Sequence, residues 1–352
     1  MNKNIVFCAD GTWNHPGETQ NGLPADTNVY KIYKALSVSA AQLTFYDDGV
    51  GADGTPVEQL VGGAIGDGLF QKIKDGYTTI AHNYRDGDQI FVFGFSRGAY
   101  TARSLAGMIA ICGLPDPDKF TGQTTQDAFD AYRTRTNRQP LLDALKRNYG
   151  NGIGGPGNAN VEIAVVGVWD TVGALGIPGG VFAGLDDQIY GFLDTSLHAD
   201  VKAAFHAVSI DERRCEFAAT LWDSRAAPDQ ILDQVWFAGN HGDVGGGWAE
   251  TGLSDLTLGW MMGKAAAKGA IFDPAVFQGY QTLEPKHALD QIHDAWSLFW
   301  GFPKSRDIPE GSVISDSVTL RLQHDPTYRP TNLPPGFPNP PGGLSLQKIV
   351  VT

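Results

Sequence analysis

Short apolar runs alternate with segments of helical periodicity along most of the chain. Each run has the length of a buried strand, and apolar residues recur at helical spacing between the runs. Such alternation favours a mostly parallel sheet with helices on both faces, whose ligands lie beyond the carboxyl ends of the strands. The expected strands are residues 4–9, 43–46, 89–95, 161–169 and 234–238, with a candidate edge strand at 344–351. The expected helices carry residues 29–36, 57–84, 97–112, 124–149 and 254–268.

Two segments fit neither pattern. Residues 171–195 hold glycines among apolar residues, and we interpret them as a mobile apolar cover. Residues 325–343 are rich in proline and are expected to wrap the surface. Because no internal repeat divides the chain, we expect a single α/β domain over residues 1–352.

The charge balance of the chain argues against nucleic acid as a partner. Lysine and arginine number 26 against 39 acidic residues, which gives a formal charge of −13. A content of 42% hydrophobic and 18% charged residues excludes a disordered chain. The chain contains no apolar run long enough to span a bilayer, and its first apolar stretch is too short for a signal peptide. We expect a soluble protein made in the cytoplasm, and export without a cleaved signal peptide stays open.

The cysteines favour neither a disulfide framework nor a structural zinc site. They form no CxxC pair and no cluster interleaved with histidine. Buried thiols are the favoured interpretation of Cys8, Cys112 and Cys215. We therefore expect neither a cofactor nor a metal ion.

The strongest local signal is the sequence GFSRG at residues 94–98, a G-x-S-x-G motif between an expected strand and an expected helix. A turn this sharp leaves no room for Cβ atoms beside the serine, so that Ser96 is exposed above the sheet as a nucleophile. The N–H of Arg97 would lie at the helix N-terminus, where it could stabilise an oxyanion. The second donor is expected from Gly11 or Thr12, at the end of the first strand. A tight turn without catalysis is the alternative.

A serine nucleophile needs a histidine base and a carboxylate that orients this base. Asp170 follows the expected strand 161–169, and His241 follows the expected strand 234–238 among glycines. The order serine, aspartate, histidine is that of α/β-hydrolases. The sequence therefore predicts a triad of Ser96, Asp170 and His241.

Other residues stay open for the same roles. His206 and His324 are alternative bases, and Asp211 and Asp243 are alternative acids. Asp211 lies in the sequence SIDERR, which favours a surface ion-pair network, and Asp243 could instead cap a helix. The remaining histidines are expected to be surface or half-buried polar residues: His15, His82, His198, His287 and His293.

Six segments together carry a family resemblance. They are FCADGTWN, GFSRGAYTARSLAG, VGVWDTVGALG, AFHAVSIDERR, WFAGNHGDVGGGW and YRPTNLP, in this order over about residues 5–333. With them the chain resembles the α/β-hydrolase-like family that contains the type VI secretion lipase effectors, which act as phospholipases A. The resemblance implies an α/β-hydrolase-like fold and puts the family's triad on Ser96, Asp170 and His241. It also implies a lipid ester substrate, transient contact with a membrane surface, and a secretion-system or immunity-protein partner.

Three functions are compared. The favoured one is a serine hydrolase of carboxylic esters, of lipids or phospholipids, and the apolar residues 174–185 favour a hydrophobic acyl chain. The second is a metal-dependent phosphohydrolase, in which aspartates at strand ends would hold Mg²⁺ or Ca²⁺. The third is a non-enzymatic binding module on the same fold. The aspartates of the second function are Asp10, Asp47, Asp48, Asp170 and Asp243.

Overall fold

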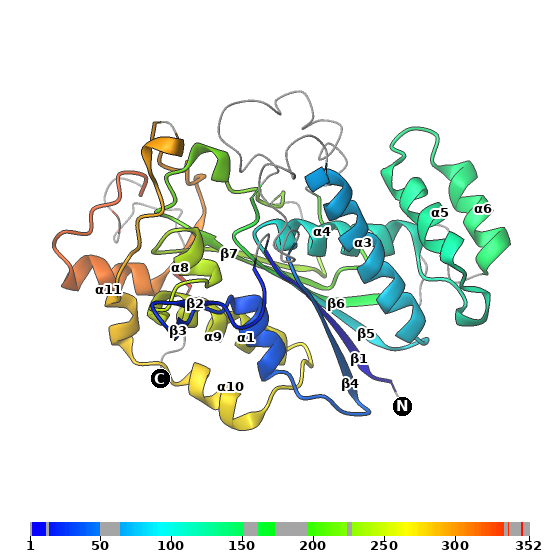
Figure 1. Ribbon diagram of the computed structural model, residues 1–352, viewed down its shortest axis with the longest axis horizontal. Helices are drawn as coiled ribbons and strands as arrows, with labels where there is room; N and C mark the ends of the chain where they lie inside the picture. The colour runs from blue at the N-terminus through cyan, green and yellow to red at the C-terminus, as the bar shows by residue number, and fades with distance from the viewer. Residues whose placement is uncertain are drawn as a thin grey trace.

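The computed structural model describes residues 2–11, 14–49, 64–150, 161–172, 196–223, 227–300, 302–333, 337 and 346–347. Its main sheet has eight strands in the order β10-β9-β8-β7-β6-β5-β1-β4, and all neighbouring strands pair in parallel (Figure 1). These strands are β1 (Asn4–Ala9), β4 (Gln42–Asp47), β5 (Gln89–Phe95), β6 (Glu162–Trp169), β7 (Ala203–Ser209), β8 (Ile231–Phe237), β9 (Val313–Ser315) and β10 (Leu346–Gln347). The predicted α/β fold with a parallel sheet is confirmed.

Helices cover both faces of this sheet (Figure 1). On one face α3 (Ala64–Asn83) and α4 (Arg97–Cys112) pack on the strands, and α5 (Gly122–Arg133) packs against them. On the other face lie α1 (Asn28–Ala35) and α9 (Gly252–Ala266). Because both faces are covered, the central strands are apolar along their whole length, as β1 shows with six buried residues. The other elements are β2 (Thr19–Gln20), β3 (Leu23–Pro24), α6 (Gln139–Tyr149), α8 (His241–Gly245), α10 (Pro274–Gln281), α11 (Asp316–His324), η1 (Pro117–Lys119), η2 (Cys215–Phe217), η3 (Pro285–Leu289) and η4 (Leu298–Trp300).

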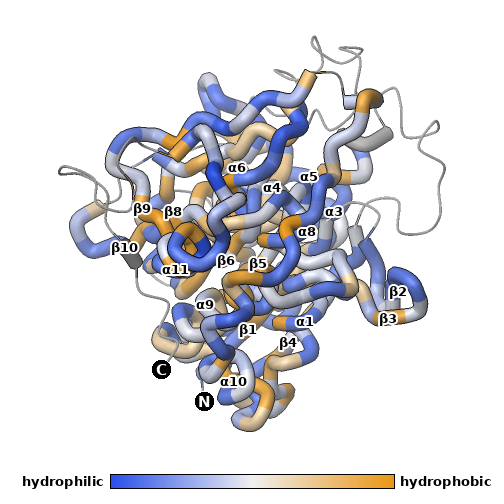
Figure 2. The backbone as a smooth tube through the Cα atoms, turned by 90° about the vertical axis from the view of Figure 1, so that its left-hand side faces the viewer, coloured by the Kyte–Doolittle hydropathy of each residue, from blue (hydrophilic) through white to orange (hydrophobic). Residues whose placement is uncertain are grey.

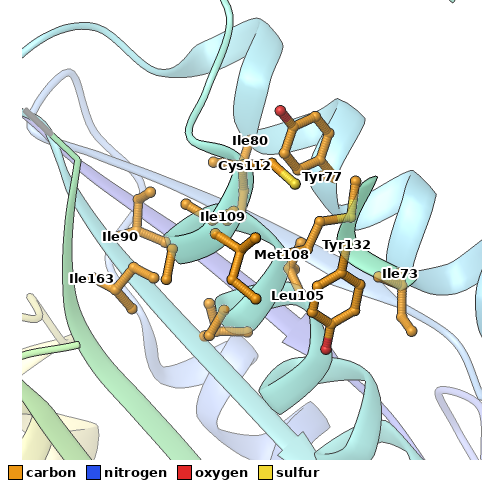
Figure 3. Close-up of a cluster of buried hydrophobic side chains, with 14 of the residues drawn as sticks. Ile73, Tyr77, Ile80, Ile90, Leu105, Met108, Ile109, Cys112, Tyr132 and Ile163 are labelled. Atoms are coloured by element: carbon orange, nitrogen blue, oxygen red, sulfur yellow. The ribbon is translucent and has the colours of Figure 1, made fainter. Parts of the chain in front are cut away.

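The core between α3, α4 and the sheet holds the start of α4 in place. Tyr77 of α3, Met108 and Ile109 of α4, and Ile90 of β5 belong to one buried cluster (Figure 3). All sixteen residues of α4 are buried. Hydrophobic stretches gather in the strands at the centre of the molecule, whereas the outer loops are mainly hydrophilic (Figure 2). The turn between β5 and α4 is therefore fixed by packing on both sides.

The prediction of one helix over residues 124–149 is wrong. The chain forms α5 and α6 instead, separated by a short turn in which Asn137 has a φ of 55°. Pro140 sits in the first turn of α6, where its missing N–H costs nothing. A proline in the interior of a helix would break it. Pro140 therefore indicates that a second helix begins at this point.

Three further elements differ from the sequence predictions. The fully buried strand β7 was not predicted, because His206 interrupts its apolar run. Strand β8 begins at Ile231, three residues before the expected start, because Ile231 is exposed and the next three residues are only partly buried. The thiol of Cys215 is exposed, although burial was expected, whereas Cys8 and Cys112 are buried.

The predicted segments have different outcomes. The edge strand is confirmed by β10, which pairs with β9 at one edge of the sheet. The predicted cover at 171–195 lies almost entirely outside the described residues, whereas the proline-rich tail is described at residues 325–333 and 337. Within the described ranges, no helix is long and apolar enough to cross a membrane. The single domain over residues 1–352 stays a prediction.

Candidate active site

Ser96 stands at a sharp turn between β5 and α4. Its backbone has φ 57° and ψ −122°, a conformation that L-residues rarely adopt and that cannot continue the strand or the helix. A Cβ on Gly94 would lie 2.3 Å from the carbonyl oxygen of Gly98, and a Cβ on Gly98 would lie 2.2 Å from that of Ala9. Both glycines are thus required by close backbone approach. The side chain of Ser96 lines a cavity of about 280 Å³.

Asp170 follows β6, the strand that pairs with β5. Its N–H donates to the carbonyl of Ala207 at 2.8 Å, and its Oδ1 accepts the N–H of Ser209 at 2.9 Å. The residue has a φ of 40° and no exposed surface. The carboxylate is therefore fixed at the carboxyl edge of the sheet between β6 and β7.

His241 is the first residue of α8, directly after Asn240, which caps this helix. The imidazole Nδ1 lies 2.6 Å from Asp170 Oδ2, and the ring packs between Phe95 and Phe217, with centroids 4.5 and 5.0 Å away. His241 lines the same cavity as Ser96. The structure thus brings together three residues, from three strand ends, that the sequence analysis singled out.

Arg306 is a further residue of this site, and the sequence analysis missed it. Its guanidinium pairs with both oxygens of Asp170, from Nη1 to Oδ1 at 2.6 Å and from Nη2 to Oδ2 at 2.9 Å. The same group donates to the carbonyls of Ser209 and Phe217. Burial by itself raises a carboxyl pKa, but the charge of Arg306 and the hydrogen bond with His241 bring the pKa of Asp170 well below its usual range. Asp170 is therefore ionised at neutral pH.

No sequence pattern marks Arg306, which lies 136 residues beyond Asp170 in an irregular segment. The one indirect signal is the segment YRPTNLP, whose role the sequence analysis left unassigned. Its Asn332 donates to the carbonyls of Arg306 and Ile210, at 3.1 and 3.0 Å. This segment therefore positions the arginine that pairs with Asp170.

The two carboxylates of SIDERR do not join the expected surface network, although Arg213 pairs with Asp294 at the surface. Asp211 accepts hydrogen bonds from Gly239 N–H at 2.7 Å and from the Tyr328 hydroxyl at 2.9 Å. Burial raises its pKa to about 6. Glu212 is buried and pairs with Arg214, and one of its oxygens accepts the N–H of His241 at 3.3 Å. Asp211 and Glu212 thus bond groups of the protein, among them the backbone of Gly239 and His241, instead of forming ion pairs at the surface.

The other candidates have structural partners. Asp243 caps α8 through the N–H of Asn240 and also bonds His293 Nδ1 at 2.6 Å. His206 is fully buried, and its Nε2 accepts the N–H of Thr171 at 3.0 Å. Burial lowers the pKa of His206 to about 3, so this ring is neutral. His324 is exposed and donates from its ring to the carbonyl of Leu320 on its own helix.

The predicted oxyanion donors have different surroundings. Arg97 begins α4, so its N–H lies at the N-terminus of this helix. The N–H of Gly11 donates to Asp10 Oδ1 at 2.7 Å, and Thr12 lies outside the described residues. Asn14, which also lines the cavity, places Nδ2 2.6 Å from the point where a Cβ on Gly11 would stand, and Ser96 Cβ is 3.3 Å from that point. Its amide is a second donor candidate that the sequence analysis did not name.

The aspartates proposed as metal ligands mostly have protein partners. Asp10 Oδ2 accepts hydrogen bonds from Thr27 and Tyr46, at 2.6 and 2.7 Å. Asp47 pairs with Lys72, and burial raises the pKa of both carboxyls, that of Asp10 to about 6. No three His, Cys, Asp or Glu side chains in the described part of the chain are grouped so that they could hold a metal ion. This arrangement gives no support to the phosphohydrolase alternative.

The pKa of His241 predicts how activity depends on pH. Burial disfavours the imidazolium and lowers this pKa below the ordinary 6.5, although the hydrogen bond and charge of Asp170 oppose the shift. Because only neutral His241 can accept a proton, activity should be lost as the pH falls through this lowered pKa. We expect the acid limb of kcat/KM to have its midpoint below pH 6.5. A midpoint above that value in a pH profile with a neutral ester would contradict this environment.

Comparisons with known proteins agree with the fold and the motifs. Residues 3–264 match the family model described as the catalytic domain of Tle1-like type VI secretion phospholipase effectors. "Uncharacterized protein YEL023C" of Saccharomyces cerevisiae is 29% identical over 239 residues, which cover 61% of this chain and 32% of that protein. The chain thus spans about a third of the length of that relative.

Two solved structures are also similar. An uncharacterized protein from Pseudomonas aeruginosa superimposes with a TM-score of 0.50 at 18% identity, over 83% of this chain and 51% of that one. The Tle1 effector bound to the VgrG spike of the type 6 secretion system has a TM-score of 0.38 at 19% identity, over 71% of this chain and 52% of that one. Because the family model matches most of the chain, the protein belongs to the family of Tle1-like type VI secretion phospholipase effector catalytic domains.

Proposed function

We propose that the protein is a serine hydrolase that cleaves carboxylic esters of lipids or phospholipids through Ser96, Asp170 and His241. The hydrogen bond of 2.6 Å between His241 Nδ1 and Asp170, beside a cavity that Ser96 also lines, carries the proposal. Membership of a phospholipase effector family supports the same class of substrate. A secretion-system component or an immunity protein as partner is inferred from the family alone.

In the proposed mechanism, Asp170 accepts the Nδ1–H of His241, which leaves the lone pair on Nε2 to take the proton of Ser96. The serine Oγ attacks the ester carbonyl and forms a tetrahedral oxyanion, which the N–H of Arg97 stabilises. The second donor is the side-chain amide of Asn14 or the N–H of Thr12, because the N–H of Gly11 donates to Asp10 Oδ1. His241 then gives its proton to the departing alcohol oxygen. A water molecule releases the acyl group by the same steps and restores Ser96.

The walls of the cavity support an apolar substrate. Aromatic and aliphatic side chains line part of the cavity, beside Ser96, His241 and the polar side chains of Asn14, Arg97 and Arg214, and this apolar part fits an acyl chain. The apolar side chains of this lining belong to Phe95, Val172, Phe217, Ala295, Trp248 and Trp300.

Labelling with a fluorophosphonate, which reacts covalently with activated serines, tests the proposal. We expect labelling of the native chain at Ser96 and hydrolysis of p-nitrophenyl esters, both unchanged by EDTA. Loss of hydrolysis with EDTA and recovery with Mg²⁺ or Ca²⁺ would favour the phosphohydrolase alternative. A chain that neither labels nor hydrolyses esters, although folded, would favour the binding module.

A pair of histidine variants separates the proposed base from its nearest alternative. His241→Ala should lower kcat on the order of 10³-fold or more, as loss of a triad base does. His206→Ala should lower kcat far less, because it removes the acceptor of Thr171 N–H and acts on stability, by about 1–3 kcal/mol. Kinetics and chemical denaturation of both variants measure the two effects. The reverse order in kcat would identify His206 as the base.

A further inference from the structure

Two exposed apolar side chains flank the cavity. Leu298 and Phe302 are 87% and 93% exposed, more than any other large hydrophobic side chain among the described residues. The next, Val38, is 72% exposed. Leu298 and Phe302 belong to the described residues 294–300 and 302–304, here called the apolar loop, which are drawn in orange in Figure 1. A single exposed apolar side chain is ordinary, but two at this exposure, four residues apart in a segment that lines the cavity, suggest a surface that a partner covers.

The apolar loop is attached at both ends to the same residue. Asp294 pairs with the guanidinium of Arg213, and the N–H of Lys304 donates to the carbonyl of Arg213 at 2.9 Å. Between these ends, Trp300 packs edge-on against Phe217, with ring centroids 5.5 Å apart. The loop is therefore held against the segment that contacts the ring of His241.

The same loop forms part of the cavity wall. Ala295 and Trp300 line the cavity together with Ser96 and His241. Since Leu298 and Trp300 are the two ends of the single turn η4, the exposed side chain and the cavity wall lie on one short turn. A partner that binds Leu298 would therefore lie next to the cavity.

The composition of the loop fits the interface of a phospholipid layer. Leu298 and Phe302 are exposed, the indole of Trp300 lies at the cavity, and the exposed cation Lys304 stands at the base of the loop, where Arg213 is paired with Asp294. Apolar tips with aromatic and basic residues behind them are typical of segments that insert at the level of lipid head groups. The net charge of −13 disfavours a strongly anionic surface, so a zwitterionic surface is the better match.

We propose that the apolar loop inserts Leu298 and Phe302 into a zwitterionic phospholipid surface and so places the cavity against the ester bonds of the lipids. This inference rests on the proposed function for its substrate, but its binding step does not require hydrolysis. Trp300 keeps the acyl chain in apolar surroundings as it passes from the lipid layer to Ser96.

The double variant Leu298→Ser/Phe302→Ser tests the loop, with Val38→Ser as a control at another exposed apolar site. Binding is measured by flotation with phosphatidylcholine vesicles, each variant carrying Ser96→Ala so that the lipid stays intact. We expect the double variant to bind the vesicles about tenfold more weakly or worse, because two apolar side chains no longer leave water. The control should bind like the parent.

A second measurement compares two substrates with Ser96 present. The double variant should hydrolyse vesicle phosphatidylcholine about tenfold more slowly. Its rate on the water-soluble ester p-nitrophenyl butyrate should equal that of the native chain, because neither Leu298 nor Phe302 lines the cavity. Equal losses on both substrates would place the effect in the chemistry and overturn the inference.

Three other results would also overturn it. Vesicle binding that does not change in the double variant removes the role of the loop, and binding only to vesicles with phosphatidylglycerol contradicts a zwitterionic surface. A native dimer that dissociates in the double variant, seen by analytical ultracentrifugation, would assign the patch to a second copy of the chain. If vesicle binding depends on Leu298 and Phe302 but no ester is hydrolysed, the inferred surface stands and the proposed function fails.

Discussion

Ser96→Ala is expected to lower kcat on p-nitrophenyl esters by about 10⁶-fold and to abolish fluorophosphonate labelling. In the proposed mechanism, the variant removes the atom that forms the acyl-enzyme, and neither His241 nor Asp170 can replace it. Folding should be unaffected, because the hydroxyl lines a cavity and the backbone strain at this position is the same with either side chain. Steady-state kinetics and thermal unfolding of the two proteins measure both expectations.

Ser104→Ala is the matched control on the same helix. The hydroxyl of Ser104 is buried in α4 and has no hydrogen-bond partner among the described residues. Its removal should leave kcat and labelling near native values and should not lower the free energy of unfolding. Turnover that persists in Ser96→Ala, or disappears in Ser104→Ala, would reject the assignment of the nucleophile.

Asp170→Asn is expected to lower kcat by about 10⁴-fold, because an amide holds the imidazole of His241 in the wrong tautomer. It should also lower the free energy of unfolding by about 3–5 kcal/mol, since the substitution leaves the buried guanidinium of Arg306 without its counter-charge. Turnover and chemical denaturation separate these two losses. Asp211→Asn serves as the comparison, because this carboxyl bonds only Gly239 and Tyr328 among the contacts described above. If Asp211→Asn lost turnover while Asp170→Asn kept nearly native turnover, Asp211 would be the acid that orients the base, and the assignment of Asp170 would be wrong.

The double variant Asp170→Asn/Arg306→Met distinguishes a structural from a catalytic loss. Methionine removes the unpaired charge while keeping an unbranched side chain, so much of the stability lost in Asp170→Asn should return. Turnover should stay low, since the carboxylate that orients His241 is still missing. If turnover returned together with stability, Asp170 would matter only as the partner of Arg306.

The features that sequence predicted well are those that depend on neighbours along the chain. The turn at Ser96 is recognisable because Gly94 and Gly98 must both lack a Cβ. These two glycines and Ser96 lie within five consecutive residues, so the sequence alone shows the motif. Asp170 and His241 follow apolar runs, so parallel pairing brings their strand ends to one edge of the sheet. That these two side chains make a hydrogen bond could be expected but not established from spacing alone.

The features that sequence did not predict depend on contacts between distant segments. Strand β7 is buried on both faces and yet contains His206, which is tolerated there because Thr171 satisfies the ring. Arg306 pairs with Asp170 from an irregular segment, where neither periodicity nor capping residues mark its position. Such pairs form only when distant segments meet in the folded protein. No pattern of neighbouring residues in a single sequence predicts them.

The separation of Asp170 from Arg306 has a consequence for biosynthesis. Arg306 lies beyond residues 3–264, the part that matches the family's catalytic domain, and 136 residues after the carboxylate that it pairs with. During translation, therefore, Ser96, Asp170 and His241 all leave the ribosome before the arginine that keeps Asp170 charged. Until this arginine docks, only the hydrogen bond and charge of His241 oppose the effect of burial, so the pKa of the carboxyl is higher than in the complete fold. A nascent chain that ends before residue 306 thus holds all three proposed triad residues but lacks the arginine that pairs with Asp170, so the proposed site is complete only after this later segment has been synthesised.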